Sequence, residues 1–431
     1  MLDREITAVR GRVLTFAADR SALHTPDGIV IMRGGLIKAV GSASALLPDL
    51  PPGTQIDHYP DHLVMPGFID AHIHYPQTRV VGSYGTQLLE WLQRYTFPEE
   101  ERLHDPEIAA GMARFFLDEL LRCGTTTACV YCTSHPASVD AFFVESERRG
   151  TRMIAGKVMM DRNAPPGLLD TAEQGVRDSE ALLRRWHGRG RQLYAVTPRF
   201  AITSTDAQLE AAGALARANP TAYVQTHLAE NHAEIAAAKA LFPWAGTYTA
   251  IYERRGLLGR RSLLGHCIHL EDGEVGMLAA SGSVAVFCPT SNLFLGSGLF
   301  DMARLRSAGV RIALATDIGG GTSYSMLRTA AEGYKVLQLQ GQSWPPLDAF
   351  YQMTRGNAEA LGLEDRIGSL APGYEADLVV LDACATPAMA QRMAACDDLA
   401  GELFALLTLG DDRAVTATYV AGRRAHPDPA A

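Results

Sequence analysis

Several features that would point to a membrane or nucleic-acid protein are missing from the 431-residue chain. No run of about 20 apolar residues is present to span a bilayer. The first segment, MLDREITAVRGRVLTF, lacks the apolar core of a secretion signal. Lysine and arginine number 39 against 48 aspartate and glutamate, and they form no long basic run. We therefore expect no nucleic acid and no membrane among the partners.

Cysteine is also scarce. The seven cysteines are odd in number and scattered along the chain, which is typical of reduced thiols and not of a disulfide framework. We therefore expect a cytoplasmic protein. With 47% hydrophobic and 20% charged residues, the composition is that of an ordinary globular enzyme. The length allows one large α/β barrel or two to three smaller domains.

Short apolar segments alternate with longer Ala- and Leu-rich helical stretches through the middle of the chain. Eight of the short segments are predicted strands: 64–74, 126–131, 152–160, 193–199, 222–227, 262–266, 284–287 and 311–317. Repeated βα units of this kind predict an α/β fold, a closed (β/α)8 TIM-like barrel. In such a barrel the chemistry lies at the C-terminal ends of the strands.

The two ends of the chain differ from the middle. They contain short β-like runs broken by Gly, Pro and Asp: 8–16, 28–32, 36–40, 376–381 and 415–420. We expect both ends to pair into one small β-sandwich domain beside the barrel. The predicted division is 1–63 and 367–431 for the two parts of that domain, and 64–366 for the barrel.

The first barrel strand ends in two histidines, His72 and His74. Side chains alternate along a strand, so both rings point to the same face. Such a pair is weak evidence by itself, because histidines also pair by chance. However, His227, His266 and Asp317 end the fifth, sixth and eighth strands. Burying so many polar groups without partners is costly. We therefore predict a site for Zn²⁺ or Fe²⁺ with a position left for water.

The run Pro66-Gly67-Phe68-Ile69-Asp70-Ala71-His72-Ile73-His74 resembles the opening motif of the amidohydrolase superfamily. In that superfamily the ligands come from strands one, five, six and eight, which matches the five residues above. Binuclear members add a carboxylated Lys or a Glu at the end of strand four. Here that position reads Thr197-Pro198-Arg199-Phe200, which implies one metal ion per subunit.

The resemblance also divides the roles. In mononuclear deaminases of the superfamily, the strand-six histidine often contacts substrate or water. His266 is therefore assigned a catalytic role, and whether it also ligates the metal is left open. The predicted metal ligands are His72, His74, His227 and Asp317.

Two other residue patterns are set aside. His232-Ala233-Glu234 and the Cys129/Cys132 pair match parts of a different zinc deaminase signature, but their order is reversed and the proline before the cysteines is missing. Lys157, on the third strand, is interpreted as a structural lysine.

Glu230 follows His227 by three residues, where a loop or first helical turn aims it back at the pocket. A deaminase would use it to shuttle protons to the ring nitrogen and the leaving ammonia. The alternative is a solvent-exposed glutamate at a helix start. Asp317 would take a proton from the water, and His266 would contact the reacting edge of the substrate. The predicted catalytic residues are thus Glu230, His266 and Asp317.

Finer motifs resemble the guanine deaminases within the superfamily. They are His74-Tyr75-Pro76-Gln77, the stretch from Leu88-Leu89-Glu90-Trp91-Leu92 to Tyr95-Thr96-Phe97-Pro98, and residues 197–200, with 156–161, Ser291-Asn292 and 356–358 in support. The resemblance implies hydrolysis of guanine at C2 to xanthine and ammonia, and a homodimer. It covers most of the chain.

Chemistry suits that substrate. Gln77 can both donate and accept, Arg199 offers several donors, and Phe200 can pack on a purine face. The alternatives are a salt-bridged arginine and a core phenylalanine. The predicted substrate contacts are His74, Tyr75, Pro76, Gln77, Arg199, Phe200, His227, Glu230, His266 and Asp317. Tyr75 stands where a smaller residue is common in the family, so a modified purine stays open as the substrate.

Two other functions remain open. One is deamination of another heterocycle, such as 8-oxoguanine, a pterin, an adenosine-like nucleoside or a triazine. The other is a non-catalytic scaffold with the same fold, which the filled ligand positions disfavour.

Overall fold

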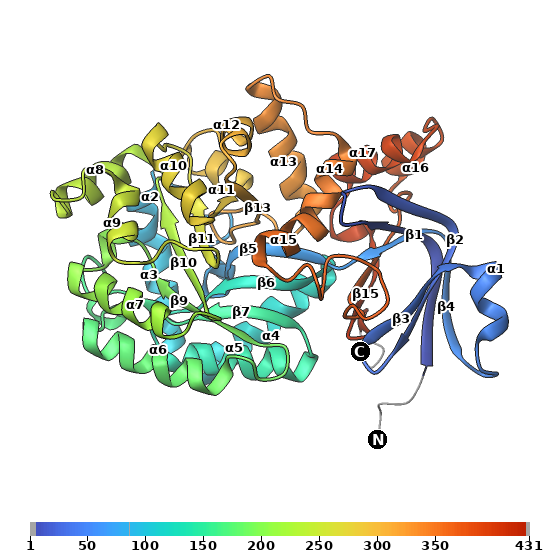
Figure 1. The fold of residues 1–431 in the computed structure, drawn as a ribbon, viewed down its shortest axis with the longest axis horizontal. Helices are drawn as coiled ribbons and strands as arrows, with labels where there is room; N and C mark the ends of the chain where they lie inside the picture. The colour runs from blue at the N-terminus through green and yellow to red at the C-terminus, as the bar shows by residue number, and fades with distance from the viewer. Residues whose placement is uncertain (1–5, 86, 428–431) are drawn as a thin grey trace.

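The structure is a computed structural model that describes residues 6–85 and 87–427. The outermost residues of the predicted sheet domain, 1–5 and 428–431, lie outside this range. Figure 1 shows two parts: a barrel of strands surrounded by helices, and a twisted sheet at one side, which contains the first and last strands, β1 (Ile6–Phe16) and β16 (Arg423–His426). Among the described residues, no helix has the length and apolar character needed to cross a bilayer.

Eight parallel strands form the barrel in sequence order, as predicted. They are β5 (Phe68–His74), β6 (Thr125–Tyr131), β7 (Arg152–Gly156), β9 (Leu193–Pro198), β10 (Tyr223–Leu228), β11 (Ser262–His266), β12 (Val284–Phe287) and β13 (Arg311–Leu314). The two-residue β8 (Val158–Met159) pairs with the end of β9. Because helices cover the outside and side chains fill the inside, most strand residues are buried on both faces.

The barrel closes where its first and last strands meet. The Asp317 N–H donates to the His72 carbonyl at 2.9 Å, and the His74 N–H donates to the Ile318 carbonyl at 2.8 Å. These bonds bring the first and last predicted ligand positions side by side at the C-terminal mouth of the barrel.

Helices follow the strands and pack around them (Figure 1). Several of the longer ones are capped by side chains: Asp105 accepts from the Glu107 N–H at the start of α4, and Thr171 accepts from the Gln174 N–H at the start of α6. The helices of the barrel part are α2 (Leu88–Trp91), α3 (Phe97–Glu101), α4 (Pro106–Arg122), α5 (Pro136–Arg149), α6 (Ala172–Trp186), α7 (Asp206–Ala218), α8 (His232–Leu241), α9 (Tyr248–Arg254), α10 (Asp272–Ser281), α11 (Pro289–Phe294), α12 (Met302–Ser307), α13 (Met326–Leu339), α14 (Pro346–Tyr351) and α15 (Asn357–Leu361).

Shorter helical segments join these elements. Two are π-helical, η3 (Leu92–Thr96) and η7 (Gln352–Gly356). The 3-10 segments are η1 (Leu47–Asp49), η2 (Tyr75–Val80), η4 (Arg102–His104), η5 (Pro166–Leu168), η6 (Ala201–Thr203) and η8 (Asp412–Ala414).

The second part is one seven-stranded sheet built from both chain ends, in the order β16-β15-β14-β4-β1-β2-β3. Its strands are β1 (Ile6–Phe16), β2 (Ala22–Arg33), β3 (Leu36–Ser42), β4 (Gln55–Pro66), β14 (Leu378–Leu381), β15 (Val415–Val420) and β16 (Arg423–His426), with α1 (Ala43–Leu46) at its edge. Bulges let the sheet curl around its own core. As a result, the Tyr59 hydroxyl on β4 lies 2.9 Å from that of Tyr419 on β15.

Several predicted boundaries shift. Residues 64–66 belong to β4, which pairs with β14, and the first barrel strand begins only at Phe68. Gly67 forms the junction, where a Cβ atom would lie 2.3 Å from the Thr126 Oγ1 atom. The predicted strand 152–160 is interrupted at Lys157, and the last strand ends at Leu314, three residues before Asp317.

The C-terminal stretch is also not all sheet. Between β14 and β15 it forms α16 (Pro387–Met393) and α17 (Leu399–Leu409), and α17 packs on α13 and α14 of the barrel. The apolar residues of α17, such as Leu403 and Leu406, therefore join the largest core cluster of the protein.

Candidate active site

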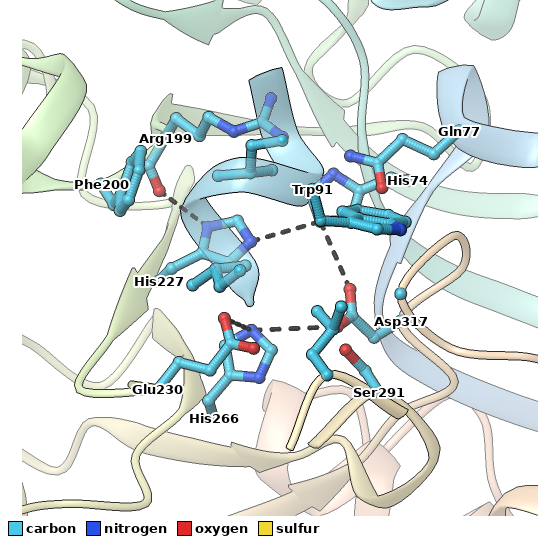
Figure 2. A pocket seen from close by; sticks show the side chains of 14 residues that line it. His74, Gln77, Trp91, Arg199, Phe200, His227, Glu230, His266, Ser291 and Asp317 are labelled. Carbon is cyan, nitrogen blue, oxygen red and sulfur yellow. Dashed lines mark hydrogen bonds and ion pairs between the residues drawn. The ribbon is translucent and has the colours of Figure 1, made fainter. Parts of the chain in front are cut away.

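The two histidines of β5 point into the barrel mouth with their Nε2 atoms 3.2 Å apart (Figure 2 shows His74). His72 is fully buried and His74 nearly so. Behind them, the Tyr131 ring on β6 packs at 4.6 Å from the His72 ring and 4.4 Å from the His74 ring. A Cβ atom on Gly265 would lie 2.7 Å from the His72 Cε1 atom, so only glycine leaves room for this ring.

His227 and Asp317 converge on the same point. The His227 Nε2 atom lies 3.3 Å from that of His74. The Asp317 Oδ1 atom lies 3.3 Å from His72 Nε2 and 3.4 Å from His74 Nε2. Ligand atoms of a tetrahedral zinc ion, at bond lengths of about 2.0–2.1 Å, are separated by about 3.3–3.4 Å. The separations among His72, His74 and Asp317, and that between His74 and His227, therefore match those around one such ion.

The protonation states favour metal binding. Burial lowers the pKa of His72 and lowers those of His74 and His227 further, so the imidazoles are neutral with lone pairs to donate. The His227 Nδ1 atom donates to the Arg199 carbonyl at 2.8 Å, which directs the Nε2 lone pair into the cluster. Burial alone would raise the pKa of Asp317, but His72 and His266 outweigh it and hold that pKa below its usual value.

His266 lies between this cluster and Glu230, the predicted acid-base residue. Its Nε2 atom lies 3.3 Å from Glu230 Oε2 and 3.8 Å from Asp317 Oδ2, and His72, His266 and Asp317 form a second possible ligand group. Asn292 accepts from its Nδ1 atom at 2.9 Å. Burial lowers the pKa of His266, but the charges of Glu230 and Asp317 outweigh this and raise it.

Glu230 is 2% exposed and faces the pocket, so it is not a solvent-exposed helix-start residue (Figure 2). The Ser297 hydroxyl donates to its Oε1 atom at 2.8 Å. Its own N–H donates to Glu234 Oε2 at 2.7 Å. Burial raises the pKa of Glu230, which brings a carboxyl group closer to the range useful for proton transfer at neutral pH.

The backbone at the mouth is strained. His266 and Asp317 have φ angles of 72° and 53°, in the left-handed region that side chains with a Cβ atom rarely adopt. Strain of this kind is found where a structure holds functional side chains in place.

These side chains form one wall of a pocket at the barrel mouth. Gln77, Arg199 and Phe200 line it as predicted (Figure 2). Leu88 and Trp91 of α2, with Leu92, line it as well, and none of these three was predicted as a contact. The remaining lining residues are His74, His227, Glu230, His266, Ser291, Leu295, Asp317 and Gly320. Polar groups thus meet apolar surface, as a flat heterocycle requires.

The predicted substrate contacts of Tyr75 and Pro76 do not agree with the structure. The Tyr75 ring is fully buried against Phe116 and Phe142, and its hydroxyl donates to the Ser138 carbonyl at 2.8 Å. Neither Tyr75 nor Pro76 lines the pocket. Both lie in η2, directly after β5, where the Tyr75 side chain faces the core and that of Gln77 faces the pocket.

Arg199 combines both of its predicted interpretations, since it lines the pocket and also forms a salt bridge. Its Nη1 atom donates to both oxygens of Glu100, at 2.8 and 2.7 Å. The same carboxylate accepts from the Gln77 Nε2 atom at 2.9 Å. Sequence reasoning missed Glu100, although a buried arginine requires a buried counter-charge.

The two patterns set aside have structural explanations. Glu234 caps α8 by accepting from the N–H groups of Glu230 and Asn231. The Lys157 ammonium forms an ion pair with Asp170 away from the histidine cluster. All seven cysteines, Cys129 and Cys132 included, are free thiols.

The fold and this site define a class. The sequence model of the Amidohydrolase family matches residues 63–425, and the chain belongs to this family. Within the family it is similar to a guanine deaminase of Escherichia coli (strain K12), with 48% identity over 397 residues that cover 92% of this chain and 90% of the relative.

Solved structures of deaminases are also similar to this chain. The chain superposes on E. coli guanine deaminase with a TM-score of 0.95 and 46% identity, covering 97% of this chain and 99% of the other. A guanine deaminase from C. acetobutylicum with guanine bound in its active site matches with a TM-score of 0.87, at 27% identity over 97% of this chain and 100% of the other. An adenosine deaminase from Xanthomonas campestris with bound zinc matches at 0.85 and 25% identity, over 98% and 93%.

Proposed function

We propose that this chain hydrolyses guanine to xanthine and ammonia in the pocket at the barrel mouth. The observation that carries the proposal is the buried Glu230 beside four converging ligand-type side chains, in a pocket that Gln77 and Arg199 also line. Its similarity to guanine deaminases over more than nine-tenths of the chain supports guanine as the substrate.

Members of the family depend on metal ions, and we propose one Zn²⁺ or Fe²⁺ per subunit, held by His72, His74, His227 and Asp317. When bound, the ion supplies Lewis acidity that makes hydroxide available near neutral pH. Zn²⁺ agrees with three imidazoles and one carboxylate.

The proton transfers fall to the chain's own carboxylates. Asp317 takes a proton from the attacking water, and Glu230 protonates the ring nitrogen next to C2. Glu230, now a carboxylate, takes the remaining proton of the hydroxyl group added at C2 and delivers it to the departing amine, so that ammonia leaves and the C2 carbonyl forms. The proton taken up by Asp317 then returns to Glu230. His266, fixed by Asn292, contacts the reacting edge and stabilises the charge that develops there.

The residues that orient the guanine ring lie on the side of the pocket opposite the metal-ligand cluster. Arg199 donates to a carbonyl oxygen or ring nitrogen of guanine, and Gln77 offers both an N–H and a carbonyl oxygen. Phe200 and Trp91 supply apolar surface for the purine rings.

We further propose a homodimer in the cytoplasm. The dimer follows the resemblance to guanine deaminases, and the free thiols agree with a reducing compartment.

The substrate is tested by incubating purified enzyme with guanine, 8-oxoguanine, adenine and cytosine, and measuring ammonia release. We expect turnover of guanine well above the others. Turnover of another base without turnover of guanine would replace the substrate and leave the metal chemistry intact.

The metal is tested by removing it. Dialysis against a chelator is expected to abolish guanine turnover, and one equivalent of Zn²⁺ or Fe²⁺ per subunit is expected to restore it. Full activity in protein shown by elemental analysis to contain no metal would contradict the proposed mechanism.

A further inference from the structure

Glu100 is a fully buried carboxylate near the pocket that the proposed mechanism does not use. It lies on α3 and is 0% exposed, yet it does not line the pocket. Its two oxygens contact two side chains that do line it, Gln77 and Arg199. These two come from opposite sides of the barrel, after β5 and after β9.

Arg199 is held in one orientation. In the described part of the chain, the hydrogen bonds of its guanidinium run through Nη1 to Glu100 alone. The Phe97 ring, one helical turn before Glu100, lies 5.3 Å from the guanidinium carbon. This leaves Nε and Nη2 available to donate to a base in the pocket.

Gln77 is fixed at both ends of its amide. Its Nε2 atom donates to Glu100, and its Oε1 atom accepts from the Gly319 N–H at 3.2 Å. These two bonds determine which end of the amide is nitrogen. One N–H and one lone pair remain for a ligand. Gly319 lies two residues after Asp317, so the contact also ties Gln77 to the loop that carries a predicted metal ligand.

We propose that Glu100 is a positioning residue that sets Gln77 and Arg199 as one unit and adapts the pocket to an uncharged purine. This rests on the proposed function, since it assigns the origin of substrate selectivity in the same site.

Charge balance is the physical reason. Arg199 is 2% exposed, and a buried cation without a partner would attract any anionic ligand that fits. Paired with Glu100, the two groups are neutral together, while the free guanidinium donors still recognise a carbonyl oxygen. The pocket therefore reads hydrogen-bonding pattern and not charge.

Glu100→Gln tests this, with Glu99→Gln as the matched control. Glu99 precedes Glu100 on the same helix but pairs with Arg102 at the surface, 3.0 Å away, and contacts neither Gln77 nor Arg199. Two quantities are measured: kcat and KM for guanine, and the affinity for urate, a purine that carries a negative charge at neutral pH, by calorimetry.

Glu100→Gln is expected to lower kcat/KM for guanine about 100-fold, because misplaced contacts cost about that much. It is also expected to bind urate about tenfold more tightly, since Arg199 loses its counter-charge. Glu99→Gln is expected to match the wild type in both. Loss of guanine turnover without a gain in urate affinity would assign Glu100 a purely structural role and overturn the proposal.

Glu100→Asp separates reach from charge, and it decides the question if the glutamine variant does not fold. It keeps the carboxylate but shortens it by one methylene. We expect lower kcat/KM for guanine and wild-type affinity for urate. Wild-type guanine kinetics in this variant would overturn the positioning role. If the wild type itself fails to turn over guanine, the proposed function is wrong, while the urate affinities still test Glu100.

Discussion

The barrel has a buried polar cluster at each end, and the two clusters differ in how their polar groups are partnered. At the mouth, the Nδ1 atoms of His72 and His74 have no hydrogen-bond partner among the described residues. At the base, charges meet opposite charges: Arg152 and Arg191 pair with Glu375 and Asp377, which lie before β14. The base cluster thereby joins the barrel to the seven-stranded sheet.

This difference in partners indicates which cluster contributes to the stability of the fold. Left-handed φ angles cost free energy, and four of them, at Ala229, His266, Cys267 and Asp317, lie at the mouth, where buried histidine nitrogens also lack partners. The base instead keeps each buried charge beside its counter-charge, an arrangement whose disruption is costly. Mutations at the mouth should therefore cost activity, and mutations at the base should cost stability.

The largest expected effect is at the mouth. Glu230→Gln keeps the shape of the side chain but removes its proton transfer, so kcat for guanine is expected to fall by about 10²- to 10⁴-fold. Metal content and the free energy of unfolding are expected to stay at wild-type values or above, because a buried charge is removed. Elemental analysis and chemical denaturation check this. Wild-type kcat would remove Glu230 from the mechanism.

At the base the pattern should reverse. Arg191→Met leaves Glu375 and Asp377 without one of their partners, and we expect the free energy of unfolding to fall by about 3–5 kcal/mol with kcat and KM unchanged. Arg189→Met is the control: it breaks an ion pair with Glu147 in which both side chains are exposed by a third or more, so it should cost about 1 kcal/mol or less. Equal losses in the two variants would contradict the comparison.

The smallest expected effect is on the pH dependence of the free energy of unfolding, and it concerns a buried carboxyl group at the mouth. Burial raises the pKa of Glu234, just beneath Glu230, to about 7. The folded protein then keeps a proton that the unfolded chain loses near pH 4.5, so the free energy of unfolding falls as pH rises from about 4.5 to about 7. In Glu234→Gln that slope should shrink by up to about 1.4 kcal/mol per pH unit.

Denaturation curves between pH 5 and pH 8 measure this slope. Asp70, whose pKa burial also raises to about 7, is expected to maintain part of it. Glu173→Gln, on the exposed face of α6, is expected to leave the slope unchanged. An unchanged slope in Glu234→Gln would show that Glu234 is already ionised throughout this range.

Much of the fold was predictable, because parallel strands buried on both faces read as short apolar runs between helical stretches. The predicted and observed limits agree fully for β11 and β12. The first strand was predicted too long, since residues 64–66 are as apolar as the barrel strand after them, and only pairing with β14 assigns them to the sheet. The helix α17 was missed for a similar reason, because its face is buried against α13 and α14, which lie far away in the sequence.

Within the pocket, the sequence predicted those residues whose type and strand position indicate a role. It did not predict residues whose role depends on a tertiary contact. His72 and His74 share a face by strand periodicity alone. Tyr75 was expected in the pocket because of its neighbours, whereas the turn into η2 places it in the core. Glu100 carries no motif of its own, and its role depends on contacts with residues 23 and 99 positions away.

The sequence by itself determined the barrel, the set of ligand-type residues at its strand ends and the family, because strand period and residue chemistry are local properties. Tertiary structure alone decided which of these side chains meet. Closure of β5 against the segment after β13 brings Asp317 to His72 and His74, and the approach of α3 to the mouth gives Arg199 its counter-charge. Contacts of this kind depend on the path of the whole chain, and no local pattern encodes them.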